Sequence, residues 1–237
     1  MQQQNQSSQT DLREALYNER LVGPDYQIQL PADRITTLHG FVFDLDPKFY
    51  AADNPLFPPA DDPVAFHANI RPVLDRHPLA RFAEVRMSGT GLHLLLLLQP
   101  AVELHSAGQQ QYWSAIVRAV QSTLPVDPGM PGITTLTRPV GATNSKNGAV
   151  VTVLKAGEPV APKDVELYLA RVAKAPFRAV ALPLLGTERI SPCPVCVKEG
   201  TRLDVLDHVG MCYGSCSKVS LKDVYDRIYL PPAKQKE

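Results

Sequence analysis

The chain has 237 residues, with 24 basic and 24 acidic side chains, and 44% of its residues are hydrophobic. This length and composition predict an ordinary globular protein with one sizeable core and room for a small appended module. The longest apolar run, residues 92–98, is too short to span a bilayer, so no membrane partner is expected. A net charge of zero argues against a nucleic-acid partner, but an acidic stretch (41–62) and a basic stretch (138–178) can lie apart in the fold.

The first ten residues, MQQQNQSSQT, are polar and uncharged and predict a disordered tail. They contain no basic segment followed by an apolar one, so a signal peptide is not expected and the protein is predicted to be cytoplasmic. Residues 11–19 have helical spacing, with Thr10 or Asp11 as the N-cap.

The following elements alternate between strand and helix patterns. Pro72 lies inside one of the helical patterns and is expected to kink or end that helix. In chain order the predicted elements are a strand at 36–45, a Pro- and Asp-rich loop at 48–62, a helix at 63–76, strands at 82–87 and 92–99, a helix at 107–124, a strand at 149–155 and a helix at 162–173. This order predicts a mixed α/β or α+β domain.

Between residues 178 and 190 the periodic pattern loosens, and all four cysteines follow. The sequence therefore predicts three parts: a tail (1–10), a catalytic domain (11–180) and a small cysteine-bearing module (191–230). A helix at 221–229 is expected to pack against this module.

The cysteines form two pairs, CPVC and CYGSC, separated by fifteen residues. This spacing is typical of a zinc ribbon, in which four thiolates close a tetrahedral Zn²⁺ site; the ligands would be Cys193, Cys196, Cys212 and Cys216. Disulfides are the alternative, and a cytosolic setting disfavours them. His208 could also replace Cys212 as a ligand, although four sulfurs remain the default.

Asp44 and Asp46 end an apolar strand in the segment FVFDLDP. Side chains at i and i+2 of a strand point to the same face, so the two carboxylates should converge. Converging carboxylates repel each other unless a cation lies between them, and oxygen ligands suit Mg²⁺ or Mn²⁺. Such a pair can hold a nucleoside triphosphate and activate a hydroxyl group. The alternative is two exposed aspartates at the end of a strand.

The segment RMSGTGLH carries a second set of candidates: Arg86, Ser88, Gly89, Gly91 and His93. Glycines let backbone amides approach a phosphate closely, and the three polar side chains add donors to its oxygens. The alternative is a hairpin turn whose glycines serve geometry alone, with a half-buried histidine. His93, however, opens a run of five leucines, where a polar residue needs a reason.

A third segment, RPVGATNSK, is polar and basic. Arg138 and Lys146 could clamp phosphates while Asn144 fixes their position. Asp127, a few residues before this segment, would supply a third carboxylate. The alternative is a polar surface loop with a turn at Asp127, and PVDPGMPG is richer in proline and glycine than a strand should be.

Together, FVFDLDP, RMSGTGLH and a Val-Asp followed by RPVGATNSK resemble the archaeo-eukaryotic primase superfamily over about residues 36–153. The resemblance implies a two-part α/β catalytic core with a sheet like that of an RNA-recognition motif and an active site in the cleft between the parts. It further implies metal ligation by Asp44, Asp46 and Asp127, and nucleotide binding by Arg86, Ser88, His93, Arg138 and Lys146.

The implied activity is that of a DNA primase or primase-polymerase, which joins nucleoside triphosphates on a single-stranded DNA template and uses its zinc module to contact the template or support initiation. One alternative is a primer-dependent repair polymerase like those attached to end-joining ligases. A second is a catalytically silent nucleic-acid-binding protein of replication. The phosphate-binding pattern GxxxxGK[ST] is absent, so a helicase would have to be a separate partner.

Overall fold

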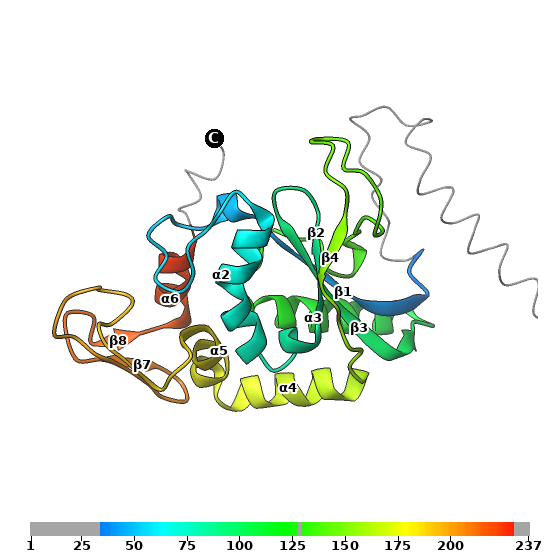
Figure 1. Cartoon of the computed structure of the whole chain (residues 1–237). Coiled ribbons are helices and arrows are strands. Elements are labelled where there is room, and N and C mark those ends of the chain that lie inside the picture. Colours follow the sequence, from blue (N-terminus) through cyan, green and yellow to red (C-terminus); the bar gives the residue numbers. More distant parts are fainter. Residues whose placement is uncertain (1–33, 128, 230–237) are drawn as a thin grey trace, which may run out of the picture. The chain divides into compact units, whose positions relative to one another are not determined.

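The computed structural model describes residues 34–127 and 129–229. Within these ranges the chain forms two four-stranded antiparallel sheets and five α-helices (Figure 1). The predicted mixed α/β class is confirmed. The predicted tail (1–10) and helix (11–19) lie outside the described residues, and the division into a catalytic domain and a cysteine-bearing module stays a prediction.

The first sheet has the strand order β1-β3-β2-β4. Its strands are β1 (Thr37–Leu45), β2 (Glu84–Met87), β3 (Leu92–Glu103) and β4 (Thr152–Lys155). In this order β1 is an edge strand: it pairs with β3 on one side, and no other described strand pairs with its outer side. That edge carries the pair of aspartates at its C-terminal end.

One face of this sheet forms the core. Along β1 the buried residues Phe41, Phe43 and Leu45 alternate with residues that are only half-buried, as expected for a strand with one covered face. In β3 the even-numbered leucines from Leu92 to Leu98 are buried in the same way. Full burial of one such side chain contributes about 1.5–3 kcal/mol, so the alternation fixes which residues of each strand stand on the other face.

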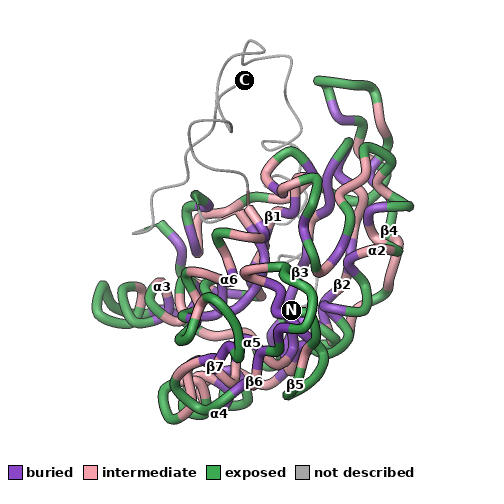
Figure 2. The backbone as a smooth tube through the Cα atoms, turned by 90° about the vertical axis from the view of Figure 1, so that its left-hand side faces the viewer, coloured by how far each residue is buried: buried purple, intermediate pink, exposed green. Residues whose placement is uncertain are grey.

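Three helices pack against this core: α2 (Pro63–Arg76), α3 (Ala107–Gln121) and α4 (Pro162–Lys174). The ring of Trp113 in α3 lies 6.2 Å from that of Phe41. In Figure 1 α2 stands beside the sheet and α4 runs beneath it. Figure 2 shows buried residues alternating with half-buried ones along β1, whereas α3 and α4 carry many exposed residues.

The helix predicted at 63–76 is confirmed as α2, and of the two effects expected of Pro72 the ending of the helix does not occur. The proline is exposed, so water can bind the carbonyl that lacks its helical partner. The stretch in which the pattern loosens contains a further helix, α5 (Pro176–Leu185). This helix is buried against several neighbouring elements, and its apolar residues lie on nearly all sides of the helix. The alternation of apolar and polar residues with helical period is therefore absent from its sequence.

The second sheet has the order β5-β6-β7-β8, formed by β5 (Arg189–Ile190), β6 (Leu203–Val205), β7 (Gly210–Cys212) and β8 (Lys218–Val219). It is joined to α5 by the N–H groups of Phe177 and Arg178, which donate to the Asp207 carbonyl at 3.0 and 3.2 Å. A Cβ atom at Gly210 would lie 2.7 Å from the Phe177 ring, so only glycine allows this contact.

The last helix, α6 (Leu221–Ile228), begins at a capping box formed by Ser220 and Asp223. Its residues Val224 and Ile228 line a shallow pocket together with Pro194 and Val195 of the cysteine-bearing module. None of the described helices is both long and apolar enough to cross a membrane.

Candidate active site and metal centre

The first sheet places three of the predicted residues in one row across its strands. Asp44 of β1 pairs with His93 of β3, and His93 pairs in turn with Arg86 of β2. Val153 of β4 completes the row opposite Arg86. Directly opposed residues of antiparallel strands point to the same face, with Cβ atoms about 5 Å apart. The row therefore stands on the face opposite the core.

Asp44 is a carboxyl group close to two others. Burial, together with the negative charges of Asp46 and Asp127, raises the pKa of Asp44 to about 6. Asp46 already attracts a cation: the Lys48 ammonium lies 2.6 Å from its Oδ2, and the Lys48 N–H donates to Oδ1 at 3.2 Å. Mutually repelling carboxylates that attract an ammonium group fit a divalent cation with oxygen ligands.

Asp127 reaches this place from a segment that is not a strand. Its N–H donates to the Asp44 carbonyl at 2.9 Å, along the outer edge of β1. Its Oδ1 accepts the Gly129 N–H at 2.8 Å, and Gln121 donates to its carbonyl at 2.7 Å. The three carboxylates do not form a tight cluster like that of the four cysteines, among the described residues. Their role as metal ligands stays a prediction.

The glycine turn of residues 88–91 is built against the end of β1. A Cβ atom at Gly91 would lie 2.8 Å from the Leu45 carbonyl oxygen, so glycine lets the turn approach the aspartate pair. Gly89 has a φ of +144° and faces the Asn144 side chain, where a Cβ atom would come within 2.6 Å. The Ser88 hydroxyl is buried and donates to the Gly91 carbonyl at 3.3 Å.

Asn144 ties the basic segment to this turn. Its side chain is buried, and its Nδ2 donates to the Ser88 carbonyl at 2.6 Å. Its Oδ1 accepts the Lys146 N–H at 3.1 Å. The interpretation of Asn144 as a residue that fixes position therefore has a geometric basis, whereas Lys146 is exposed beside it.

The connection between η4 (Gly132–Thr134) and β4 lies against the row of site residues. The Thr137 hydroxyl is 2.7 Å from His93 Nδ1, and Arg86 Nη1 donates to the Arg138 carbonyl at 3.3 Å. Arg86 also forms an ion pair with Glu84, two residues earlier on the same face of β2. Thr137 and Lys48 were not predicted from the sequence: the partner of Thr137 is set by a tertiary contact, whereas Lys48 pairs locally with Asp46.

His93 is uncharged at neutral pH. Burial, with the positive charges of Arg138 and Arg86, lowers its pKa to about 4 from the ordinary 6.5. The neutral ring forms a hydrogen bond with Thr137 through Nδ1. No residue within 34–127 and 129–229 forms a hydrogen bond with Nε2. It is left to meet a ligand on this face.

This pKa shift predicts a pH dependence of stability. Between pH 6.5 and 4 the unfolded chain binds a proton at His93 that the folded chain does not, so the stabilisation is complete above pH 6.5 and is lost as the pH falls. From pH 7 to pH 5 the loss should be about 2 kcal/mol. A His93→Asn variant keeps a polar group near Thr137 but does not titrate, so urea unfolding should show about 2 kcal/mol less loss than in the wild type. Equal losses in both proteins would contradict the neutral buried histidine.

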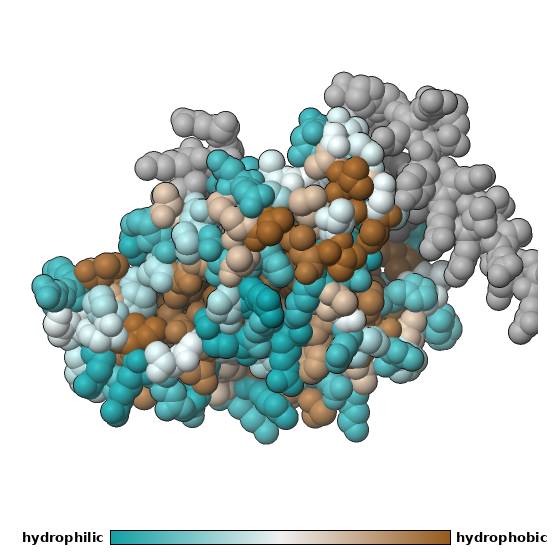
Figure 3. All heavy atoms as spheres, in the orientation of Figure 1, coloured by the Kyte–Doolittle hydropathy of each residue, from teal (hydrophilic) through white to brown (hydrophobic). Residues whose placement is uncertain are grey.

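Arg138 and Lys146 supply cations beside an apolar surface. Among the described residues neither side chain has an ion-pair or hydrogen-bond partner of its own. Exposed apolar side chains occur along the same stretch of chain, namely Leu136, Val140, Val150 and Val153. Figure 3 shows apolar side chains gathered on this face over β4 and the connection before it. Unpaired cations on an exposed segment can bind phosphate groups.

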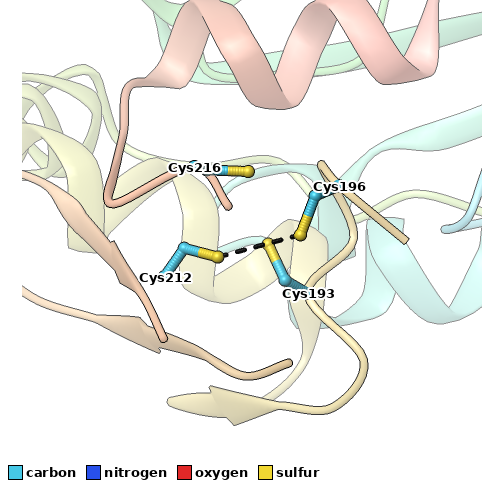
Figure 4. A group of neighbouring side chains, drawn as sticks. All are labelled: Cys193, Cys196, Cys212 and Cys216. Atoms are coloured by element: carbon cyan, nitrogen blue, oxygen red, sulfur yellow. Dashed lines mark hydrogen bonds between the residues drawn. The ribbon is translucent and has the colours of Figure 1, made fainter. Parts of the chain in front are cut away.

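The four cysteines converge in the second sheet (Figure 4). All are free thiols, and their sulfur atoms lie within 4.8 Å of one another. The Cys196 and Cys212 sulfurs are 3.8 Å apart. Tetrahedral Zn²⁺ with Zn–S bonds of about 2.3 Å places its sulfurs about 3.8 Å apart, so the donor set fits zinc.

The pKa values of the cysteines are shifted in different directions: burial raises those of Cys193 and Cys216, whereas that of Cys196 is lowered. Burial opposes ionisation of Cys196, but the Lys198 N–H and the Thr201 hydroxyl outweigh it and lower the pKa of this thiol to about 6. The residues after Cys196 and Cys216, Val197 and Ser217, have φ values of 51° and 59°. Positive φ values of this kind are uncommon outside glycine and mark tight turns; the turn at Val197 brings the Lys198 N–H to the Cys196 sulfur. His208 is exposed and is not part of the cluster.

The amino-acid sequence matches no known protein-family profile and no curated protein. Among solved structures, the chain is similar to the AEP domain of the primase-polymerase (PrimPol) of cyanophage S-2L, with 14% sequence identity and a TM-score of 0.41. The alignment covers 58% of this chain and 63% of the phage chain, which is less than two thirds of that chain's length. A similarity this low does not assign a function, so a function has to be argued from the side chains described above.

Proposed function

We propose that this protein is a metal-dependent nucleotidyltransferase that synthesises primers on single-stranded DNA from nucleoside triphosphates. The observation that carries the proposal is the row Asp44–His93–Arg86 across three strands, with Asp127 bonded to the edge of the same strand as Asp44. The row is acidic at Asp44, and Arg86 is ion-paired with Glu84, so the free positive charges beside the row are those of Arg138 and Lys146. A triphosphate with its divalent cation has the complementary distribution of charge.

The chain's own groups divide the task between them. Asp44, Asp46 and Asp127 would hold Mg²⁺ or Mn²⁺, which supplies charge neutralisation at the phosphates and a lowered pKa for the attacking hydroxyl. The neutral His93 would donate to a phosphate oxygen, and Arg138 and Lys146 would balance the charge of the triphosphate. The hydroxyl loses its proton to solvent and its oxygen bonds to the α-phosphorus, the bond from that phosphorus to the bridging oxygen breaks, and pyrophosphate leaves with the electron pair.

The second sheet would serve as a structural zinc module through Cys193, Cys196, Cys212 and Cys216. The 3.8 Å between the Cys196 and Cys212 sulfurs supports zinc as the metal. The second sheet contacts α5, which in turn contacts α6, and this supports folding of the zinc module as part of the same unit as the first sheet. A primer-dependent repair polymerase would use the same residues, and a silent DNA-binding protein would use only the basic and apolar surface.

Synthesis without a primer separates these three possibilities. The full chain is incubated with single-stranded DNA, labelled nucleotides and Mn²⁺ or Mg²⁺, and products are resolved on a denaturing gel. We expect short products without any primer. Extension of a supplied primer alone would favour the repair polymerase, and DNA binding without either product would favour the silent protein. Ribonucleotide and deoxyribonucleotide mixtures in parallel identify the substrate.

A further inference from the structure

The C-terminal helix reaches the acidic end of β1 through tyrosine hydroxyl groups. Tyr229, which follows α6, donates to the Val126 carbonyl at 2.8 Å, and Tyr225 within α6 donates to the Ser122 carbonyl at 3.0 Å. Val126 is the residue directly before Asp127. Two hydrogen bonds thus connect α6 and the residue after it to the segment that precedes a predicted metal ligand.

A third tyrosine joins the same cluster from the other acidic segment. Tyr50, four residues after Asp46, is buried and donates to the Pro125 carbonyl at 2.6 Å. Its ring stacks on that of Tyr229 at 5.6 Å, and Tyr229 stacks on Tyr225 at 5.8 Å. The tyrosine stack, defined as Tyr50, Tyr225 and Tyr229, therefore contacts both segments that carry the aspartates.

Backbone contacts reinforce this arrangement. The Ala51 N–H donates to the Ile228 carbonyl at 2.9 Å, and Tyr50 and Tyr229 form an isolated antiparallel bridge. The segment around Pro125 and Val126 has no strand partner of its own, so hydroxyl groups satisfy carbonyls that would otherwise be buried without a donor.

We propose that the tyrosine stack positions Asp127 beside Asp44, so that α6 sets the geometry of the acidic metal site. Tyr50 and Tyr229 act as positioning residues: they do not touch the substrate, but they hold the carbonyls of the two residues before Asp127. The inference rests on the proposed metal-binding role of the aspartates. It adds that a metal site on the first sheet depends on residues that follow the four cysteines in the chain.

The test measures Mn²⁺ binding directly, by the electron paramagnetic resonance signal of free Mn²⁺ in titrations of the full, zinc-loaded chain. Tyr50→Phe and Tyr229→Phe each keep the ring stack and remove one hydroxyl group. We expect each to raise the dissociation constant for Mn²⁺ about tenfold, the size of effect that follows from the loss of one buried hydrogen bond. Zinc content should stay at the wild-type value.

Tyr168→Phe is the matched control. It also removes a buried tyrosine hydroxyl, which lies 2.9 Å from His77 Nε2 and interacts with the Thr123 side chain but with neither the Pro125 nor the Val126 carbonyl. It should leave the Mn²⁺ affinity unchanged even where it lowers the unfolding midpoint. A folded Tyr229→Phe and a folded Tyr50→Phe with wild-type Mn²⁺ affinity would overturn the inference.

Failure of the proposed function would look different. If Asp44→Asn leaves Mn²⁺ binding at its wild-type value, the aspartates form no metal site, and the tyrosine stack has nothing to position. If Asp44→Asn abolishes binding and the tyrosine variants do not affect it, the metal site stands and the positioning role is wrong.

Discussion

Replacement of Asp44 by asparagine should reduce nucleotidyl transfer by at least about 10³-fold, equivalent to about 4 kcal/mol of transition-state stabilisation. The substitution preserves the shape of the side chain and removes the charge that a metal ion would require. Asp44 is half-buried and surrounded by carboxylates that raise its pKa, so asparagine at this position removes electrostatic repulsion and should not destabilise the fold. Incorporation of labelled nucleotide is compared with the unfolding midpoint of the same preparation.

Asp61→Asn provides the matched control, because Asp61 is an exposed aspartate in the loop before α2. It undergoes the same chemical change away from the row of site residues and should retain full activity. If the Asp44→Asn variant were as active as Asp61→Asn, the result would contradict the metal-dependent mechanism. The exposed surface around Arg138 would then be the basis for a DNA-binding protein without catalysis.

Loss of zinc should have the largest effect on stability. Cys212→Ser removes one of four ligands, and zinc binding in small modules contributes on the order of 10 kcal/mol to their folding. The second sheet has short strands and few buried apolar groups of its own, so its packing against Phe177 of α5 should be lost with the metal. We expect a zinc content near zero and an unfolding midpoint lower by more than about 10 °C.

Tyr213→Ser is the neighbouring control, since Tyr213 is 56% exposed and its ring contacts only the Arg202 guanidinium among the described aromatic and cationic groups. It should keep one zinc per chain and a midpoint close to that of the wild type. Because α6 starts shortly after Cys216, loss of zinc should also reduce synthesis on a supplied primer. A loss confined to primer-free synthesis would instead show that the module serves initiation alone.

The polar residues of the site could be found in the sequence because each breaks a local pattern. Asp44 follows an apolar strand, His93 opens a run of leucines, and the cysteines have metal-ligand spacing. Strand alternation then fixes the face on which Asp44 and His93 stand. The roles of Ser88 and Asn144 were less visible, because both use hydrogen-bonding atoms to hold the glycine turn in place.

The sequence by itself determined the order of the strands of the first sheet and of helices α2, α3 and α4, the cysteine cluster and the residues of the acidic and basic segments, because these depend on periodicity and spacing along the chain. The tertiary structure alone decided the pairing of β4 with β2, which leaves the edge of β1 to Asp127. It also decided that Tyr229 meets Val126, 103 residues earlier in the chain. Contacts between distant segments leave no periodic signal in either segment, since each partner is chosen by the packing of the whole fold.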